Sequence, residues 1–386
     1  MSEFRTIREL CSVVVDCPHS TPKWTANGKI VIRNKNIKHG KIDFSSPSYT
    51  DDEHFAQRIK RAKPQPGDII ITREAPIGDV GMIPENTECC LGQRMVLLRA
   101  NQSVCDNFYL LYSLQSLYVQ HQISWSEGTG TTVSNLRIPH LEQIQIPYLP
   151  LEQQAKISSV LRALEEKIEN NRRLNDNLQQ QAAALFSSLY DRTNTEVRFT
   201  DLIQILGGGT PKTGENTYWN GNIAFFTPKD VGTPYTLITE KTISKEGLSH
   251  CNSRLYPVNT VFVTARGTVG KVGMSGVPMA MNQSCYALVG KETHQLLVYF
   301  YTLKAVDRLK HKASGAVFDA ITTRDFESEQ IMKLSDDDAT AFLRVAEPMF
   351  QEVLNNNIEN LRLSTLRDSL LPKLMSGEID VSAVQL

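Results

Sequence analysis

Residues 69–82, IIITREAPIGDVGM, recur in altered form as residues 261–274, VFVTARGTVGKVGM. Identical Thr, Gly, Val, Gly and Met residues fall in one ungapped register between the two stretches. Each copy opens with a β-branched run and continues into a turn that contains glycine, which predicts a strand, a tight loop and a second strand. A repeat at this distance predicts that the whole fold is duplicated within the chain.

Further landmarks recur in the same order, about 190 residues apart. Thr21-Pro22-Lys23 corresponds to Thr210-Pro211-Lys212, and the β-branched run 31–37 corresponds to residues 225–231. Gln93 then matches Gln283, and Tyr112 matches Tyr301. The preserved order favours two tandem lobes of similar structure.

Each lobe is predicted to be a mixed α/β domain. Short β-branched runs broken by Gly, Pro and Asn come first, followed by a helix near residues 107–122 in the first lobe and 295–312 in the second. A Gly-rich loop (127–132 or 313–316) and a short apolar strand (143–147 or 330–334) end each copy. The predicted boundaries are 1–150 for the first lobe, 151–195 for a helical spacer, 196–334 for the second lobe and 335–386 for a second helical spacer.

Residues 151–190 contain neither Gly nor Pro and predict one long helix. Its seam residues alternate by four and three, as in a coiled coil: Ile157, Leu161, Leu164, Ile168, Asn171, Asn175, Leu178, Ala182, Leu185 and Leu189. The second helix, near residues 337–371, repeats the spacing with Phe350, Leu354, Asn357 and Leu361. We expect the two helices to pack antiparallel, with the seam asparagines facing polar groups that fix the register.

Composition limits the class of protein. The chain has 386 residues, 41% of them hydrophobic, and a formal net charge of −1, so its overall charge does not indicate nucleic acid. Residues 29–63 are locally basic and the last sixty residues are acidic. The seven cysteines form no CxxC pair and the eight histidines show no metal-ligand spacing, so no metal site is expected. No apolar run is long enough to span a membrane and the N-terminus lacks the pattern of an export signal, which favours a cytoplasmic protein without a membrane partner.

The ordered motifs resemble those of one known family. These motifs are the duplicated Thr-Pro-Lys segment, the Arg266-Gly267-Thr268-Val269-Gly270 loop, the helix start at residues 149–154 and the ending at residues 370–379. Together they are similar to the specificity subunit of type I restriction-modification systems, over essentially the whole chain. The resemblance implies an α+β protein with two tandem mixed α/β target-recognition domains, separated by long helices that form an antiparallel coiled coil.

The resemblance also implies function and partners. Each lobe would recognise one half of a split sequence in double-stranded DNA, and the helices would dock methyltransferase (modification) subunits and a motor-nuclease (restriction) subunit. Those partners would hold S-adenosylmethionine, ATP and Mg, so this chain is expected to bind no cofactor and to be non-catalytic.

Three functions remain open from the residues alone. The chain contains no Asn/Asp-Pro-Pro-aromatic tetrapeptide, no GxGxxG entering a helix after a strand and no GxxxxGK[ST] loop, which disfavours methyl transfer and ATP hydrolysis. Asp68 and Glu74 could form a nuclease carboxylate cluster, but no Lys follows at the expected place, which disfavours a free-standing nuclease. A sequence-specific DNA-binding subunit is the main hypothesis. The alternative is a coiled-coil scaffold or adaptor of a defence system that binds protein alone.

Candidate DNA contacts fall mainly in the loops after the strands. Arg73 and Arg266 carry planar forks that fit guanine O6 and N7, Glu74 could accept from cytosine N4 or hold Arg73, and the amides of Gln93, Asn282 and Gln283 suit adenine. The other predicted DNA-binding residues are Lys23, Arg33, Lys35, Lys60, Arg61, Lys63, Thr72, Arg94, Lys212, Lys229, Thr264, Thr268 and Lys271. Basic side chains among them need only charge to hold phosphates.

The length of the forty-residue helix is predicted to set the distance between the two lobes and hence between the half-sites. At about 1.5 Å per residue it spans about 60 Å, and four residues inserted after Gln180 add about 6 Å, close to two base-pair steps of ~3.4 Å. We expect the insertion variant to keep both half-site sequences and to lengthen the gap between them by about one to two base pairs. Sequencing the methylated bases of a host that expresses the variant with its methyltransferase measures the half-site sequences and the gap. An unaltered gap would contradict the prediction that helix length sets the spacing.

Overall fold

The computed structural model describes residues 3–38, 40–125, 135–312 and 320–382. The chain divides into two compact units, residues 1–166 with 363–386 and residues 167–362. Both boundaries fall inside long helices, α6 (Leu151–Tyr190) and α11 (Asp336–Ser376). The predicted Gly-rich loops 127–132 and 313–316 lie outside the described residues.

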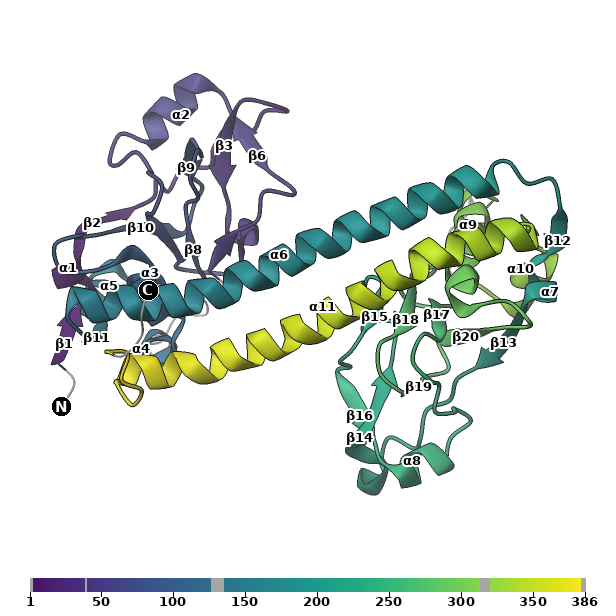
Figure 1. Cartoon of the computed structure of the whole chain (residues 1–386). Helices are drawn as coiled ribbons and strands as arrows, with labels where there is room; N and C mark the ends of the chain where they lie inside the picture. The colour runs from purple at the N-terminus through teal and green to yellow at the C-terminus, as the bar shows by residue number, and fades with distance from the viewer. Residues whose placement is uncertain (1–2, 39, 126–134, 313–319, 383–386) are drawn as a thin grey trace. The chain divides into compact units, whose positions relative to one another are not determined.

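The first lobe contains a four-stranded sheet, a three-stranded sheet and two separate strand pairs (Figure 1). Its main sheet has the order β2-β10-β7-β8 and is antiparallel throughout, whereas the sheet β6-β3-β9 contains one parallel pair. The described elements are β1 (Glu3–Thr6), α1 (Ile7–Leu10), β2 (Cys11–Asp16), β3 (Lys29–Ile32), η1 (Asn34–Asn36), β4 (Ile37–Lys38), β5 (Lys41–Ile42), β6 (Ser48–Thr50), α2 (Asp52–Arg58), β7 (Ile69–Thr72), β8 (Val80–Met82), β9 (Cys89–Leu91), β10 (Met95–Ala100), α3 (Asn107–Gln115), α4 (Leu117–Trp125), α5 (Ile138–Gln143) and β11 (Gln145–Tyr148).

The second lobe repeats this topology. Its sheets have the orders β13-β20-β17-β18-β15 and β16-β14-β19, and the first and last strands pair as β1 and β11 do. Its elements are β12 (Glu196–Arg198), α7 (Phe199–Leu202), β13 (Ile203–Gly207), η3 (Asn216–Tyr218), β14 (Trp219–Phe226), β15 (Tyr235–Thr236), β16 (Lys241–Ile243), α8 (Lys245–Ser249), β17 (Val261–Thr264), β18 (Val272–Ser275), β19 (Met279–Met281), β20 (Cys285–Gly290), α9 (Gln295–Lys312), α10 (Thr323–Ser328) and β21 (Gln330–Met332). The duplication predicted from the sequence is therefore present in both sheets, although the second lobe adds β15 to its main sheet and the first lobe has a separate pair, β4-β5.

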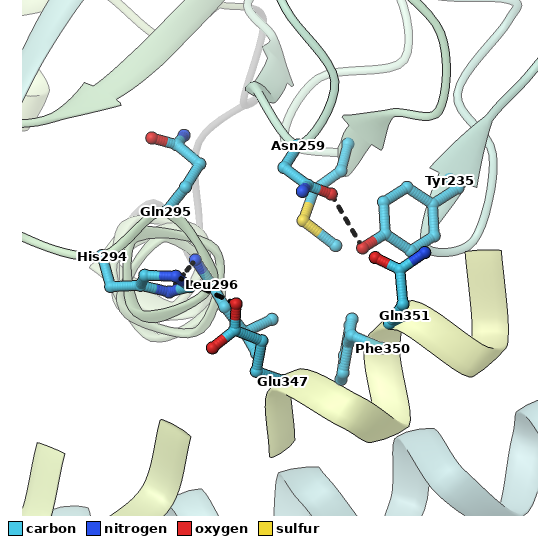
Figure 2. A pocket seen from close by; sticks show the side chains of 9 residues that line it. Tyr235, Asn259, His294, Gln295, Leu296, Glu347, Phe350 and Gln351 are labelled. Carbon is cyan, nitrogen blue, oxygen red and sulfur yellow. Dashed lines mark hydrogen bonds and ion pairs between the residues drawn. The ribbon is translucent and has the colours of Figure 1, made fainter. Parts of the chain in front are cut away.

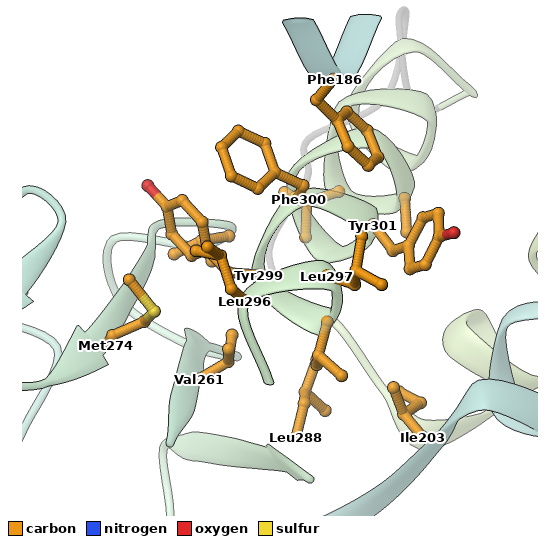
Figure 3. Close-up of a cluster of buried hydrophobic side chains, with 14 of the residues drawn as sticks. Phe186, Ile203, Val261, Met274, Leu288, Leu296, Leu297, Tyr299, Phe300 and Tyr301 are labelled. Atoms are coloured by element: carbon orange, nitrogen blue, oxygen red, sulfur yellow. The ribbon is translucent and has the colours of Figure 1, made fainter. Parts of the chain in front are cut away.

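The core of unit 2 joins sheet to helices (Figure 3). Val261 and Leu288 of the sheet pack with Leu297 and Phe300 of α9, all of them buried. Phe186 of α6 stacks on Phe300, with ring centroids 4.9 Å apart. Burial of these apolar side chains removes their surface from water, which stabilises the fold of unit 2. The sequence pattern placed Leu185 on the seam, but Leu185 is only partly buried and Phe186 takes the inner position.

The predicted asparagine pairing is confirmed within unit 2. Asn171 Nδ2 donates to Glu359 Oε2 at 2.6 Å and to Asn360 Oδ1 at 3.0 Å, while Asn175 Nδ2 donates to Asn357 Oδ1 at 2.9 Å. Asn356 returns a bond of 2.9 Å to Asn175 Oδ1. Residue numbers rise along one helix as they fall along the other, so these segments are antiparallel.

Of the predicted seam residues, Leu161, Ile168 and Leu354 are buried, and Leu164 and Leu178 are partly buried. Leu361 was predicted wrongly: it is 37% exposed, and the neighbouring Asn360 turns inward to Asn171 instead. A strict seven-residue spacing drifts from the 3.6-residue period of the helix, which rotates position 361 off the seam.

Two helix boundaries also differ from the pattern. The helix predicted near 107–122 is divided at Ser116, whose Oγ donates to Ser113 O at 2.6 Å and competes with the helical backbone bonds. The final helix passes Pro372 and ends at Ser376, because Leu374 and Met375 are buried in the core of unit 1. Packing there offsets the roughly 3 kcal/mol that an interior proline costs. None of the described helices is long and apolar enough to cross a membrane.

One substitution pair tests the seam in unit 2. Ile168→Asp places a charge at a position that is 4% exposed, and we expect it to lower the free energy of unfolding by about 3 kcal/mol. Leu174→Asp makes the same change on the same helix at a position that is 44% exposed, and should change stability by about 0.5 kcal/mol or less. Urea denaturation followed by circular dichroism measures both, and equal losses would argue against a buried seam at Ile168.

Candidate nucleic-acid interface

The β7–β8 and β17–β18 loops are closed by the same hydrogen bonds. Thr72 Oγ1 accepts from Asp79 N at 2.9 Å, and Thr264 Oγ1 accepts from Lys271 N at 2.9 Å. Gly78 N and Gly270 N donate to the carbonyls of the same threonines, each at 2.9 Å. Both glycines have positive φ, +82° and +73°, a conformation that side chains disfavour.

Two further segments of the first lobe contact the β7–β8 loop directly, and a third is attached through one of them. Asn34 Nδ2 donates to Glu74 O at 2.6 Å, and Arg73 N donates to Arg94 O at 2.8 Å. Gln93 Nε2 donates to His19 O and thereby connects the turn before β10 to the segment that carries Lys23. We call residues 18–23, 33–36, 72–79 and 92–94 the first loop cluster.

The second lobe assembles corresponding segments. Thr268 Oγ1 donates to Pro228 O at 3.1 Å, Ala265 N donates to Ser284 O at 2.8 Å, and Gly209 N donates to Met281 O at 3.1 Å. Thr210 Oγ1 donates to Gln283 Oε1, so the glutamine that corresponds to Gln93 again holds the Thr-Pro-Lys segment. We call residues 208–212, 227–230, 264–271 and 282–284 the second loop cluster.

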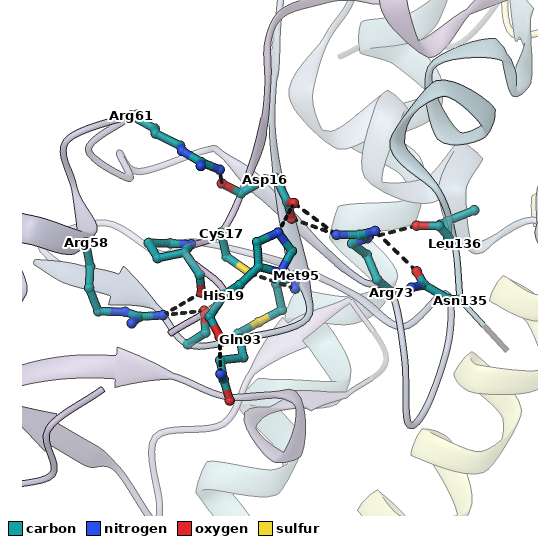
Figure 4. A network of polar contacts seen from close by, with 12 residues as sticks. Asp16, Cys17, His19, Arg58, Arg61, Arg73, Gln93, Met95, Asn135 and Leu136 are labelled. Atoms are coloured by element: carbon teal, nitrogen blue, oxygen red, sulfur yellow. Dashed lines mark hydrogen bonds and ion pairs between the residues drawn. The ribbon is translucent and has the colours of Figure 1, made fainter. Parts of the chain in front are cut away.

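Arg73 does not present its guanidinium as the sequence predicted (Figure 4). Nη1 bonds both carboxylate oxygens of Asp16 at 2.9 and 3.0 Å, Nε donates to Leu136 O at 2.9 Å, and Nη2 donates to Asn135 Oδ1 at 3.2 Å. The side chain is only 12% exposed. With these donors engaged inside the lobe, Arg73 has a structural role in this structure, and its contact with a base stays a prediction.

Arg266 differs from Arg73 in this respect. Its side chain is exposed, and no hydrogen bond or ion pair to it occurs among the described residues, while its backbone is fixed by bonds to Ser284 O and by a bridge to Ala320. Gly267, with a φ of +82°, follows it directly. A guanidinium with free donors on a fixed backbone has the geometry for bidentate contact with a guanine edge.

Several other polar predictions fall on residues that hold the loops together. Thr72 and Thr264 are buried and use their hydroxyls to close the loops, which makes them structural. Glu74 pairs with Arg94 at 3.2 Å rather than with Arg73. The Gln93 and Gln283 amides each make one loop contact, and Asn282 Oδ1 accepts from Ser284 N at 3.0 Å. Adenine contacts by these amides remain predictions.

The predicted phosphate contacts fall into two groups. Some are engaged within the lobes: Lys23 pairs with Asp51 at 3.5 Å, Lys35 donates to Ser46 at 2.8 Å, Arg61 donates to Asp16 O at 3.4 Å, Lys63 pairs with Glu88 at 2.9 Å and Lys229 pairs with Glu240 at 3.4 Å. Arg33 stacks over Trp24, 4.9 Å from the ring centroid. Lys60, Lys212 and Lys271 have no such partner among the described residues, which leaves their ammonium groups available to an anion.

One carboxylate limits the positive charge near Lys63. Glu88 accepts hydrogen bonds from Lys29 and Lys63, and these bonds lower the pKa of Glu88 to about 2. Glu88 therefore stays ionised at neutral pH and neutralises part of this basic surface. Lys63 is consequently a weaker candidate for a phosphate contact than Lys60, which belongs to the same basic stretch.

Sequence reasoning missed Asp16 and Arg58, whose contacts hold segments of the first loop cluster in place. Asp16 holds Arg73 and also lies 2.9 Å from His19 Nε2, and the buried Arg58 bonds four backbone carbonyls. The one available signal was that Arg58 lies three residues after Phe55 on the inner face of a short helix. Its bonding partners, distant in sequence, give no local signal.

A cavity of about 90 Å³ in unit 2 lies outside the second loop cluster (Figure 2). Tyr235 Oη donates to Asn259 Oδ1 at 3.0 Å in its wall, and His294 Nε2 lies 3.7 Å from Glu347 Oε1. None of its lining residues belongs to the cluster. Within the described part of the chain, no group of three His, Cys, Asp or Glu side chains could hold a metal ion.

The different environments of Arg73 and Arg266 predict that their substitutions change the free energy of unfolding by different amounts. Arg73→Ala leaves the largely buried Asp16 without its main partner and should lower the free energy of unfolding by about 3 kcal/mol. Arg266→Ala removes an exposed side chain and should change it by about 0.5 kcal/mol or less. Thermal and urea unfolding of both variants give the comparison. If Arg266→Ala proves as destabilising as Arg73→Ala, Arg266 is not a free surface side chain.

Known proteins share this architecture. The family model of the type I restriction modification DNA specificity domain matches residues 3–180 and again 192–333. The MjaIX specificity subunit of Methanocaldococcus jannaschii is 22% identical over 82% of this chain and 78% of its own, and the EcoR124I/EcoR124II specificity subunit of Escherichia coli is 33% identical over 25% of this chain and 24% of its own. The crystal structure of the type I restriction-modification S subunit from M. genitalium has a TM-score of 0.63 at 17% identity, covering 97% of this chain and 96% of that one. Two copies of the family domain span most of the chain, which therefore belongs to the type I restriction modification DNA specificity family.

Proposed function

We propose that each loop cluster binds one half of a bipartite sequence in double-stranded DNA. The observation that carries the proposal is the repeated frame: the same four segments meet in both lobes, and the same threonine bonds close the central loop. A rigid frame with variable tips positions side chains against base edges, whereas phosphates only need nearby cations. The exposed Arg266 supplies a base-reading group, and Lys212 and Lys271 supply cations beside it.

The two clusters present different side chains. In the first, Arg73 is withdrawn into an ion pair and Arg94, paired with Glu74, remains more exposed, at 57% of its side chain. In the second, Arg266 is free of partners among the described residues. Different exposed side chains on the same arrangement of loops suit two half-sites of different sequence.

The helices offer a separate surface for protein partners. Leu174 and Val345 are 44% and 41% exposed in unit 2, and Leu366 is 45% exposed in unit 1. Leu174 lies on α6, and Val345 and Leu366 lie on α11, so both long helices keep exposed apolar side chains that a protein partner could cover. We propose that α6 and α11 dock methyltransferase and motor-nuclease subunits, which hold S-adenosylmethionine, ATP and Mg. The chain itself then recognises DNA and catalyses no step.

Arg266→Ala tests base recognition in the second lobe. We expect it to lower affinity by about 1 to 3 kcal/mol and to relax one position of the second half-site, leaving the first half-site unchanged. The measurements are sequencing of methylated bases in a host that expresses the chain with its methyltransferase, and binding to the sequence so found.

Lys212→Ala is the matched comparison in the same cluster. A phosphate contact weakens binding to all sequences evenly and reduces its salt dependence, without relaxing any base. An unchanged methylated motif and unchanged affinity for Arg266→Ala would reject the assignment of Arg266. If the unaltered chain binds the methyltransferase but yields no bipartite motif, the scaffold function is favoured instead.

A further inference from the structure

Arg58 is a buried cation at the end of α2, and it connects two segments of the first loop cluster (Figure 4). Its Nε donates to Leu91 O at 2.7 Å and its Nη2 donates to Gly92 O at 2.8 Å, both next to the turn that carries Gln93 and Arg94. Nη1 donates to Ser20 O at 3.0 Å and Nη2 also donates to Pro18 O at 3.2 Å, in the segment that leads to Lys23. The residue is 6% exposed, so it cannot itself reach DNA.

The burial of this charge needs a compensating interaction. No carboxylate among the described residues forms an ion pair with Arg58, and desolvation lowers the pKa of its guanidinium. A buried charge without a counter-ion is costly unless its donors are satisfied, and here four backbone carbonyls satisfy them. These carbonyls lie at or beyond strand ends. The planar five-donor fork of arginine can connect several of them at once, which the three donors of a lysine ammonium on a flexible stem cannot do in the same way.

In the described part of the second lobe, backbone contacts rather than a cation join the corresponding segments. A Cβ on Gly208 would lie 2.1 Å from Asn282 O, and a Cβ on Gly209 would lie 2.6 Å from Asn252 N. Ser253 Oγ accepts from Met281 N at 2.9 Å in the same region. Direct backbone contact, made possible by two glycines, therefore replaces the arginine.

We propose that Arg58 is a positioning residue for recognition of the first half-site. It fixes the distance between the segment of Lys23 and the turn of Gln93 and Arg94, and Gly208 has the equivalent role for the second half-site. The inference rests on the proposed function of the loop clusters, but it names residues that act through the backbone and do not contact DNA.

The test compares Arg58→Ala with the unaltered chain, each expressed as a full chain with its methyltransferase, by sequencing methylated bases of the host genome. We expect Arg58→Ala to relax the first half-site and to reduce discrimination there by about tenfold, the amount that one well-placed bidentate contact provides. The second half-site should keep its sequence. Gly208→Ala should give the mirror result, with relaxation confined to the second half-site.

Two further variants separate positioning from general loss of folding. Arg8→Ala is the matched control, since Arg8 lies in α1 of the same lobe, is exposed and, among the residues that the structure describes, pairs only with Glu142 at 3.7 Å; it should leave both half-sites unchanged. Arg58→Lys keeps the charge and part of the hydrogen bonding, so it should lose less stability than Arg58→Ala while relaxing the first half-site partially. If Arg58→Ala unfolds the first lobe, the methylated motif obtained with Arg58→Lys tests the positioning role instead.

The outcomes are distinct. An Arg58→Lys variant that remains folded and retains full discrimination at the first half-site overturns the inference, as does an Arg58→Ala variant with an unchanged motif. Equal relaxation of both half-sites by Arg58→Ala also overturns it, because a positioning role is confined to one lobe. If the unaltered chain itself gives no bipartite motif, the proposed function has failed before Arg58 is tested.

Discussion

A hydrogen bond from a loop N–H to a buried threonine hydroxyl closes the central loop of each lobe, and both loop clusters depend on it. A loop that leaves a sheet must satisfy its backbone groups somewhere, since a buried N–H without a partner costs free energy. Thr72 and Thr264 supply the acceptor at the strand end, and Gly78 and Gly270 supply the positive φ that brings the chain back. The loop is thereby held at a fixed place, where two other segments of the cluster contact it and the Thr-Pro-Lys segment is attached through the glutamine.

This arrangement separates the frame of each lobe from what the lobe presents. The frame uses threonine, glycine and glutamine contacts that recur in both copies, while the exposed residues of the central loops differ. They are Ala75 and Pro76 in the first lobe and Arg266, Gly267, Thr268 and Lys271 in the second. Arg73 turns inward because Asp16 offers a bidentate carboxylate, and Arg266 has no such carboxylate near it among the described residues. A duplicated fold can in this way hold two different recognition surfaces without a change in topology.

The sequence predicted the duplication, the strand-loop-strand units, the long helices and the asparagine pairing, because these depend on periodicity and on order along the chain. It could not predict which loop side chains face outward. Arg73 is held by Asp16, 57 residues away in sequence, and Arg58 is held by carbonyls 33 to 40 residues away. The seam position predicted for Leu361 is wrong for a related reason. Residue spacing fixes the buried face of a helix only approximately, and the hydrogen bond between Asn171 and Asn360 determines which residue faces inward there. The final helix passes Pro372 because the burial of Leu374 and Met375 outweighs a local signal to stop.

The central claim is that the two loop clusters are the DNA-binding surfaces of this specificity subunit. Hydrogen–deuterium exchange of the full chain, with and without a duplex that contains the bipartite sequence returned by methylome sequencing, tests it most directly. The account predicts slower exchange in residues 72–79 and 92–94 of the first cluster and in 264–271 and 282–284 of the second, with the helices α6 and α11 unchanged by DNA alone. Protection confined to the helices, or absent from both central loops, would contradict it.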